Sequence, residues 1–216
     1  MKISASILNV NPNELDDYLI KMKESGLEYL HLDIMDGVFV PNNTIKVELQ
    51  KEVKKHNFIF DTHLMVDHPQ EYYRDFIKEG SNYVTFHYEA VKDPNKLIDK
   101  IHSMGAKCGI SIKPNTSVSV LIPYLDKIDL VLVMSVEPGF GGQKFMPSAI
   151  EKVEHLDELR SDNISFDYLI EVDGGIGLDE SKDLVKAGAD LVVMGTYLKK
   201  CADPKALIEE VNKLEY

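Results

Sequence analysis

The stretch His31-Leu32-Asp33-Ile34-Met35-Asp36-Gly37 alternates polar or sulfur-bearing side chains with aliphatic ones before it ends in Asp-Gly. Side chains alternate across a β-strand, so His31 and Asp33 share one face while Leu32 and Ile34 share the other. Asp-Gly is a strong turn signal and ends the predicted strand. An imidazole and a carboxylate two residues apart on a strand can reach one metal ion. The alternative is a strand end whose polar side chains face water.

Apolar runs of this kind recur along the chain and predict eight strands, at residues 3–8, 29–34, 59–65, 83–87, 107–112, 130–135, 168–172 and 191–194. Amphipathic stretches between them predict helices. Several open with Asp, Asn or Ser before Pro and close on Gly, which are good helix boundaries. The clearest helices are expected at residues 13–24, 70–79, 94–104, 148–160, 179–187 and 204–214.

Alternation of strands and helices favours a parallel sheet. Eight repeats in 216 residues suit a closed α/β barrel, the (β/α)8 or TIM barrel, better than an open doubly wound sheet. No linker or low-complexity segment interrupts the series, so residues 1–216 are expected to form one domain. The second crossover is the weakest element: the loop Asn42-Asn43-Thr44 and a helix within 45–56 must supply it.

Charge and composition exclude several classes of partner. The net charge is −12, from 36 acidic and 24 basic residues. No basic stripe offsets this charge, which disfavours nucleic acid and anionic membranes. The chain shows no signal peptide and no apolar run as long as a membrane span. Cys108 and Cys201 form no C-x-x-C pair, so no disulfide framework is expected. A cytoplasmic location is the simplest prediction.

In a TIM barrel, binding and catalytic residues lie at the carboxyl ends of the strands and in the loops that follow. His31 and Asp33 lie in the second predicted strand, His63 lies in the third, and Asp173 follows the seventh. Two imidazoles and two carboxylates form a donor set suited to Zn²⁺, Fe²⁺, Mn²⁺ or Co²⁺. A polar cluster without a metal is the alternative.

Glycines follow the last three predicted strands, in Gly139-Phe140-Gly141-Gly142, Gly174-Gly175 and Gly195. Glycine lets backbone N–H groups approach an anion closely, and the loops after strands seven and eight of this fold are a frequent phosphate site. The G-x-G-x-x-G spacing of a dinucleotide site is missing. A phosphate site beside a metal site suggests a phosphorylated sugar as substrate.

These residues lie in motifs that resemble the ribulose-phosphate 3-epimerase family, TIM-barrel enzymes that invert C3 of ketopentose phosphates. The matching motifs span nearly the whole chain and occur in the same order as in the family. Its most specific motifs are His-x-Asp-x-Met-Asp-Gly at 31–37 and Pro-Gly-Phe-Gly-Gly-Gln at 138–143. Supporting segments are Ser4-Ala5-Ser6-Ile7-Leu8, His63-Leu64-Met65-Val66, Val84-Thr85-Phe86-His87 and Val172-Asp173-Gly174-Gly175-Ile176.

The resemblance implies a role for each matching residue. One divalent metal ion per chain, with Zn²⁺ the first choice and Fe²⁺, Mn²⁺ or Co²⁺ as alternatives, would be held by His31, Asp33, His63 and Asp173. Asp33 and Asp173 would also be the two acid/base groups, acting through a metal-stabilised 2,3-enediolate. The substrate-binding residues would be Ser6, His63, Met35, Met65, Met134, Gly139, Phe140, Gly141, Gly142, Gly174, Gly175, Gly195 and Thr196. The resemblance to this family also implies that the chain forms a homo-oligomer.

Three departures from the family leave the substrate open. They are the run that begins Asn43-Thr44, Thr196 where Ser is usual, and Glu137 where Asn or Asp is more common. D-ribulose 5-phosphate is the expected substrate, and a ketohexose phosphate such as allulose 6-phosphate is the alternative. A keto-sugar-phosphate decarboxylase would need Lys in an Asp-x-Lys-x-x-Asp motif, which Asp33-Ile34-Met35-Asp36 lacks. A non-catalytic sugar-phosphate-binding barrel would not need both Asp33 and Asp173.

Overall fold

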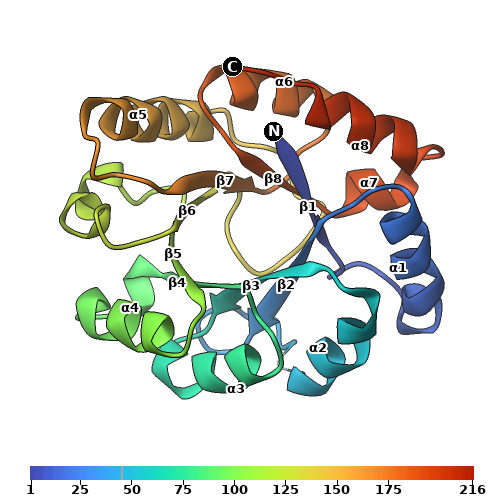
Figure 1. Cartoon of the computed structure of the whole chain (residues 1–216), viewed down its shortest axis with the longest axis horizontal. Helices are drawn as coiled ribbons and strands as arrows, with labels where there is room; N and C mark the ends of the chain where they lie inside the picture. Colours follow the sequence, from blue (N-terminus) through green and yellow to red (C-terminus); the bar gives the residue numbers. More distant parts are fainter. Residues whose placement is uncertain (45) are drawn as a thin grey trace.

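The computed structural model describes residues 1–44 and 46–216; Ile45, in the predicted second crossover, lies outside the described residues. Eight parallel strands pair in chain order, and β8 closes the ring on β1 (Figure 1). The strands are β1 Lys2–Ser6, β2 Tyr29–Met35, β3 Ile59–Met65, β4 Tyr83–His87, β5 Lys107–Ile112, β6 Leu130–Met134, β7 Leu169–Asp173 and β8 Leu191–Met194. The predicted (β/α)8 barrel is confirmed, and the predicted strands differ from these bounds by at most two residues at either end.

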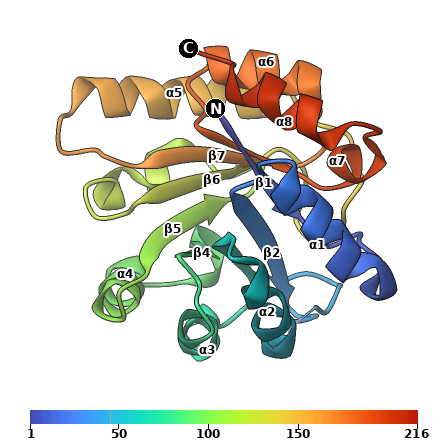
Figure 2. The same cartoon turned by 45° about the vertical axis from the view of Figure 1, so that its right-hand side comes forward.

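Helices surround this ring on its outer side (Figures 1 and 2). The α-helices are α1 Leu15–Glu24, α2 Val47–Val53, α3 Tyr73–Lys78, α4 Pro94–Ser103, α5 Ser148–Asp162, α6 Leu178–Lys186, α7 Thr196–Lys200 and α8 Pro204–Asn212. Short 3₁₀ segments are η1 Pro12–Glu14, η2 Lys54–His56, η3 Pro69–Glu71, η4 Tyr88–Ala90, η5 Val118–Val120 and η6 Ile122–Tyr124. In the described chain, η5 and η6 replace an α-helix between β5 and β6.

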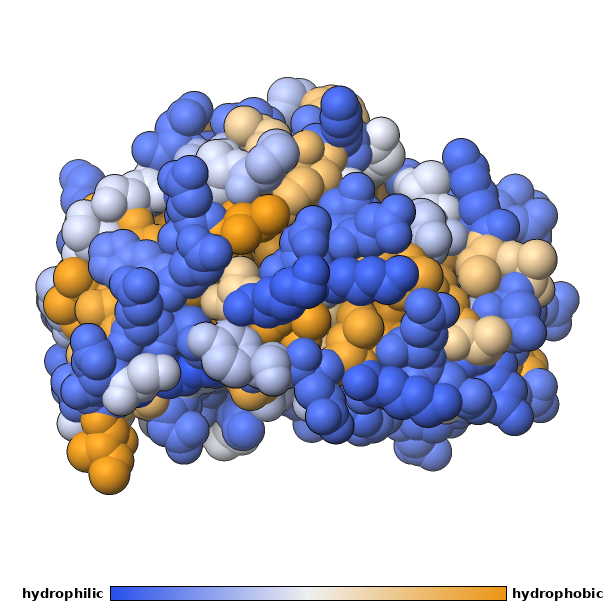
Figure 3. Space-filling model, turned by 90° about the horizontal axis from the view of Figure 1, so that it is seen from above, coloured by the Kyte–Doolittle hydropathy of each residue, from blue (hydrophilic) through white to orange (hydrophobic). Residues whose placement is uncertain are grey.

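The main hydrophobic core lies between the barrel and its helices. On α4, for example, Leu97, Ile98 and Ile101 are buried, at the spacing of three and four residues that puts side chains on one face of a helix. Outward-facing strand residues such as Leu64 and Ile170 complete this core. The molecular face in Figure 3 is mostly hydrophilic, with apolar residues in scattered groups, in keeping with the strongly negative net charge.

The barrel interior changes from apolar to polar toward the carboxyl ends of the strands. Tyr83, Leu130 and Leu132 belong to an apolar cluster inside it. Asp61 and Glu171 are also fully buried there, beside the predicted site. Polar side chains this deep need partners or a counter-charge, because burying them alone is costly. The barrel interior therefore combines apolar packing with polar side chains that lie beside the predicted site.

The two chain ends meet on one side of the barrel (Figure 2). The amino group of Met1 donates to the carbonyl oxygen of Leu214 at 3.1 Å, and α8 packs against β1. This contact supports the closure of β8 on β1. Within the described chain, none of the helices is both long and apolar enough to cross a membrane.

Isoleucine at two positions offers a matched test of this core. Ile170 on β7 is fully buried, whereas Ile164 in the preceding loop is fully exposed. We expect Ile170→Ala to lower the free energy of unfolding by about 2–5 kcal/mol, because it leaves a cavity in the core. Ile164→Ala should change it by no more than about 0.5 kcal/mol. Chemical denaturation measures both values, and equal effects would contradict this account of the core.

Candidate active site

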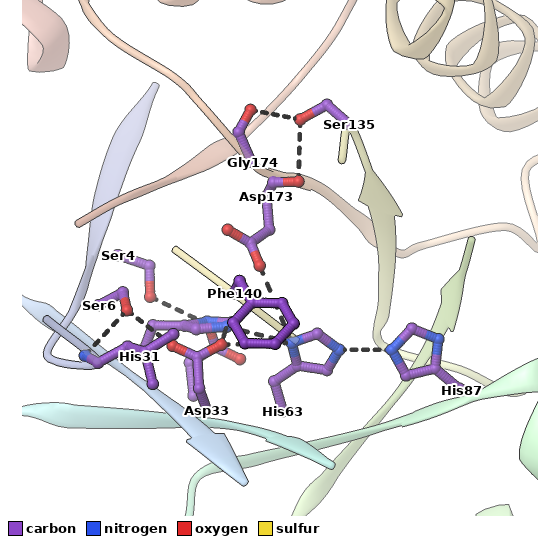
Figure 4. A network of polar contacts seen from close by, with 12 residues as sticks. Ser4, Ser6, His31, Asp33, His63, His87, Ser135, Phe140, Asp173 and Gly174 are labelled. Carbon is purple, nitrogen blue, oxygen red and sulfur yellow. Dashed lines mark hydrogen bonds and ion pairs between the residues drawn. The ribbon is translucent and has the colours of Figure 1, made fainter. Parts of the chain in front are cut away.

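Four titratable side chains meet at the carboxyl ends of three strands. The register pairs Asp33 of β2 directly with His63 of β3, and Asp173 ends β7 across the barrel. His31 Nε2 lies 3.4 Å from His63 Nδ1 and 3.5 Å from an oxygen of Asp33. His63 Nδ1 lies 3.8 Å from Asp33 and 4.0 Å from Asp173. The structure therefore brings the four predicted metal ligands together (Figure 4).

Hydrogen bonds fix the positions of the two site aspartates. The Ser6 hydroxyl on β1 donates to the Asp33 carboxylate at 2.7 Å. The Ser135 hydroxyl, just after β6, donates to the carbonyl oxygens of Asp173 at 2.9 Å and Gly174 at 2.8 Å. Side chains from neighbouring strands thus hold Asp33 and the backbone at Asp173, so that both carboxylates point into the same space (Figure 4).

His31 is held from inside the barrel. Its Nδ1 lies 2.5 Å from Asp61, and the Ser4 hydroxyl donates to the same carboxylate oxygen at 3.0 Å. Burial lowers the pKa of His31, but the carboxylates of Asp61 and Asp33 outweigh it and raise this pKa well above its ordinary value. An Nδ1–H donated to Asp61 leaves Nε2 facing the cluster.

Burial and neighbouring charges also shift the pKa values of His63 and Asp173. Burial, with His87 and His31 nearby, holds the pKa of His63 well below its ordinary value, so this ring is neutral. Burial, opposed by His31 and reinforced by Asp33 and Asp61, raises the pKa of Asp173 to about 7. A cation between the four groups would offset the repulsion between the carboxylates and favour their ionised forms.

The donor set fits a divalent transition metal. One atom from each of His31, Asp33, His63 and Asp173 can be chosen so that all lie within 4.8 Å of one another. Tetrahedral ligands about 2.1 Å from Zn²⁺ would lie about 3.4 Å apart, close to the shorter separations seen here. Neutral imidazole and carboxylate are also the ligands that this group of metals takes. The residues are compatible with the predicted divalent ion, with Zn²⁺ among the candidates.

A cavity of about 740 Å³ opens in front of this cluster. That volume is in the usual range for a small-molecule site. The side chains of Asp33 and Asp173 reach it, with 6% and 18% of their surface exposed, while His31 and His63 lie fully buried behind them. The other predicted substrate-binding residues also line it: Ser6, Met35, Met65, Met134, Gly139, Phe140, Gly141, Gly142, Gly174, Gly175, Gly195 and Thr196.

A close backbone contact requires glycine at one position in the cavity wall, and a second glycine there lies against a side chain. Gly175 has φ of +66°, and a Cβ there would clash with the backbone nitrogen of Phe145. A Cβ on Gly141 would clash with the side-chain nitrogen of Asn9. That nitrogen also donates to the Thr196 hydroxyl at 3.0 Å. Asn9 therefore joins the loops after β1, β6 and β8, a role that its sequence position does not signal.

The divergent run after Asn42 packs on the site strand. The Thr44 hydroxyl donates to the carbonyl oxygen of Asp33 at 2.5 Å, and the Met35 N–H donates back to this hydroxyl at 3.0 Å. Asp36, predicted as a turn residue, accepts N–H bonds from Val38 and Phe39 at 2.8 Å each. This connection therefore helps to position β2 beside the cavity.

No role is predicted from the sequence for the polar groups that lie behind the predicted ligands. Asp61 lies two residues before His63, and Glu171 lies two residues before Asp173, so strand alternation alone places each on an inward face. His87 lies 2.9 Å from His63 and approaches Glu89 at 3.3 Å. Alternation could have found the first two, whereas the contact between His63 and His87 needs the barrel.

Comparisons with known proteins find one family and several similar chains. The family model described as the ribulose-phosphate 3 epimerase family matches residues 2–199. A Candida glabrata protein named ribulose-phosphate 3-epimerase is 40% identical over 233 residues, covering 98% of this chain and 92% of that protein. A Bacillus subtilis protein of the same name is 35% identical over 213 residues and 98% of each chain. A rice relative, named as a cytoplasmic isoform, is 40% identical, covering 98% of this chain and 93% of that protein.

Solved structures share the fold at much lower identity. The 3-hexulose-6-phosphate synthase from Salmonella typhimurium has a TM-score of 0.70 and 15% identity, covering 99% of this chain and 98% of its own. KGPDC from Streptococcus mutans has a TM-score of 0.70 and 12% identity, covering 98% of this chain and 97% of its own. These two likenesses support the barrel fold alone.

Alanine at two positive-φ glycines separates backbone strain from a steric clash. Gly26 has φ of +88° and nothing within 4 Å of the Cβ that alanine would add, whereas Gly175 faces the backbone of the 143–145 loop. We expect Gly26→Ala to cost about 1–2 kcal/mol of unfolding free energy. Gly175→Ala should cost more, because the facing backbone has to move. Chemical denaturation compares the two variants, and an equal cost would show that the site loop adapts freely.

Proposed function

The chain belongs to the ribulose-phosphate 3-epimerase family, as its motifs predict, and on this premise we propose that it interconverts D-ribulose 5-phosphate and D-xylulose 5-phosphate. The observation that carries the proposal is the pair of carboxylates, Asp33 on β2 and Asp173 on β7, that reach one cavity from opposite sides of the barrel (Figure 4). Inversion at one carbon needs a proton acceptor on one face and a donor on the other, and this pair supplies both.

The two aspartates are suited to exchange roles between the forward and reverse reactions. One removes the proton from C3 to give a planar enediolate, and the other returns a proton to the opposite face. Burial together with nearby carboxylates raises the pKa of Asp173 to about 7 in the metal-free site, and a bound cation would favour the ionised form that accepts the C3 proton. The Ser6 hydroxyl, which donates to Asp33 at 2.7 Å, holds that carboxylate in place and lies within reach of a substrate oxygen.

His31, Asp33, His63 and Asp173 would hold the divalent metal ion. When bound, such an ion polarises the oxygens on C2 and C3 and makes the C3 proton more acidic. His31 and His63 are fully buried, so bulk water does not reach these two proposed ligands. Met35, Met65 and Met134 are almost fully buried, and they exclude water without adding a competing proton donor.

The glycine-rich loops at the other end of the cavity are suited to the phosphate group. Gly174, Gly175 and Gly195 place backbone beside the cavity without intervening side chains. Phe140 is 56% exposed and lines the cavity, where it can cover a bound sugar. Cytoplasmic location and homo-oligomer formation stay predictions.

Incubation with D-ribulose 5-phosphate in D₂O tests the proposed reaction. We expect proton NMR to show D-xylulose 5-phosphate and loss of the C3 proton signal in both sugars. Asp33→Asn and Asp173→Asn should each lower turnover by about 10²–10⁴-fold, because each removes one acid/base group. Asp162→Asn, an exposed position at the end of α5, is the matched control and should keep full activity.

Two outcomes would refute this assignment. Absence of both exchange and product with metal supplied would reject the epimerase reaction. Near-normal turnover by either site variant would reject the two-carboxylate mechanism. A parallel incubation with allulose 6-phosphate tests the ketohexose alternative, and faster turnover of that sugar would change the assigned substrate.

Metal analysis tests the ligand set. We expect about one divalent ion per chain, and chelation should abolish activity until Zn²⁺, Fe²⁺, Mn²⁺ or Co²⁺ is restored. His63→Ala should lose the ion, whereas His155→Ala, at an exposed position on α5, should keep it. Full activity in the metal-free protein would show that the cluster works without a metal.

A further inference from the structure

A hydrogen-bonded chain of three side chains runs away from the metal-facing side of His63. Nδ1 of this ring faces the cluster, while its Nε2 lies 2.9 Å from Nε2 of His87 at the end of β4. Nδ1 of His87 then lies 3.3 Å from the carboxylate of Glu89 in η4. Both imidazoles are fully buried. Figure 4 shows the first link, from His63 to His87.

Glu89 sets the direction of these hydrogen bonds. Burial raises the pKa of its carboxyl, but hydrogen bonds from His87, Thr116 and the Lys113 N–H prevail and lower it to about 2. An ionised carboxylate can only accept hydrogen bonds, so Nδ1 of His87 has to carry a hydrogen. The neutral ring then has its lone pair on Nε2, and that lone pair accepts from Nε2–H of His63.

The consequence is that Nδ1 of His63 has no hydrogen and points its lone pair at the cluster. We propose that His87 and Glu89 are positioning residues that fix this tautomer of His63 and thereby prepare it to bind the metal ion. The proposal rests on the proposed function in one respect, the assignment of His63 as a metal ligand. It adds two residues that are not among the four predicted ligands and do not line the cavity.

The opposite tautomer is disfavoured by the same contacts. With a hydrogen on Nδ1 of His63, its Nε2 lone pair would face His87, which would then have to donate from Nε2. A neutral His87 in that form would turn a lone pair toward the negative Glu89. Two acceptors facing each other in a buried site are repulsive and leave a hydrogen bond unmade. Glu89 therefore controls His63 through one intervening ring.

The surroundings hold the two positioning residues in place. The Phe39 ring packs on His87 with centroids 4.8 Å apart, and the Lys113 ammonium lies 4.0 Å from the Phe39 centroid. Glu89 accepts from the Lys113 N–H at 2.8 Å and from the Thr116 hydroxyl. The loop that supplies these donors is fixed by Lys152, whose ammonium donates to three of its carbonyl oxygens.

His31 has a shorter version of the same arrangement. Its Nδ1 contacts Asp61 directly at 2.5 Å, which leaves Nε2 toward the cluster. Each metal-facing histidine is thus oriented by a carboxylate, one directly and one through His87. Carboxylates behind histidine ligands fix the tautomer, and their loss typically weakens metal binding by about 10–100-fold.

Histidine NMR and Zn²⁺ affinity together test the proposal. In the metal-free protein labelled with ¹⁵N-histidine, long-range ¹H–¹⁵N spectra should show His63 with its hydrogen on Nε2. His87→Leu and Glu89→Ala should each shift His63 toward the other tautomer and weaken Zn²⁺ binding, measured by chelator competition, by about 10–100-fold. His87→Gln should recover most of the affinity, because its amide can accept from His63 and donate to Glu89.

His102→Leu is the matched control, since His102 also contacts an aspartate, Asp129 at 2.8 Å, but lies at the surface on α4. It should change neither measurement. Wild-type Zn²⁺ affinity with an unchanged His63 tautomer in Glu89→Ala would overturn the proposal. If His87→Leu does not fold, Glu89→Ala and His87→Gln decide the question. If the wild-type protein binds no Zn²⁺, the metal assignment fails. The His63 tautomer alone then supports or overturns the proposed role of His87 and Glu89.

Discussion

The pairing of β2 with β3 is the constraint on which the site depends. In this register Asp33 lies beside His63 and His31 lies beside Asp61, so a single ladder of backbone hydrogen bonds places three of the predicted ligands and one supporting carboxylate. A slip of one residue would turn all inward side chains of a strand outward. The aliphatic residues between them, such as Leu32 and Leu64, prevent this slip because they fill the core under the helices.

Several polar groups of the barrel interior are stabilised by contacts with a partner. Asp61 accepts from Ser4 and contacts His31, while His63 contacts His87 and Ser6 donates to Asp33. Buried charges without such partners would be strongly destabilising. The same contacts orient the side chains toward the cavity. The interactions that offset the cost of burying these polar groups therefore also position them for the proposed cation and substrate. Stability and function share one network here.

The cavity wall depends instead on loops whose backbones lie close to one another. Glycines in the loops after β6, β7 and β8 let those loops meet each other and the loop after β1, as the contact between Gly141 and Asn9 shows. Backbone N–H groups on such surfaces can bind a phosphate group even in a protein whose acidic side chains outnumber lysine and arginine. The end of the cavity that holds the proposed metal ligands is thus built from side chains, and the end proposed for the phosphate is built from backbone.

The amino-acid sequence by itself determined the fold, the strands and the residues at the carboxyl ends of those strands, because period-two patterns, Gly and Pro boundaries and specific motifs are local signals. It placed His31, Asp33, His63 and Asp173 together through the topology of the barrel. Only the tertiary structure decided how these groups are supported. His87 and Glu89 gain their relation to His63 across strands β3 and β4, and Asn9 reaches Thr196 across 187 residues of chain. Distances between side chains on different elements follow from packing, which no local pattern encodes.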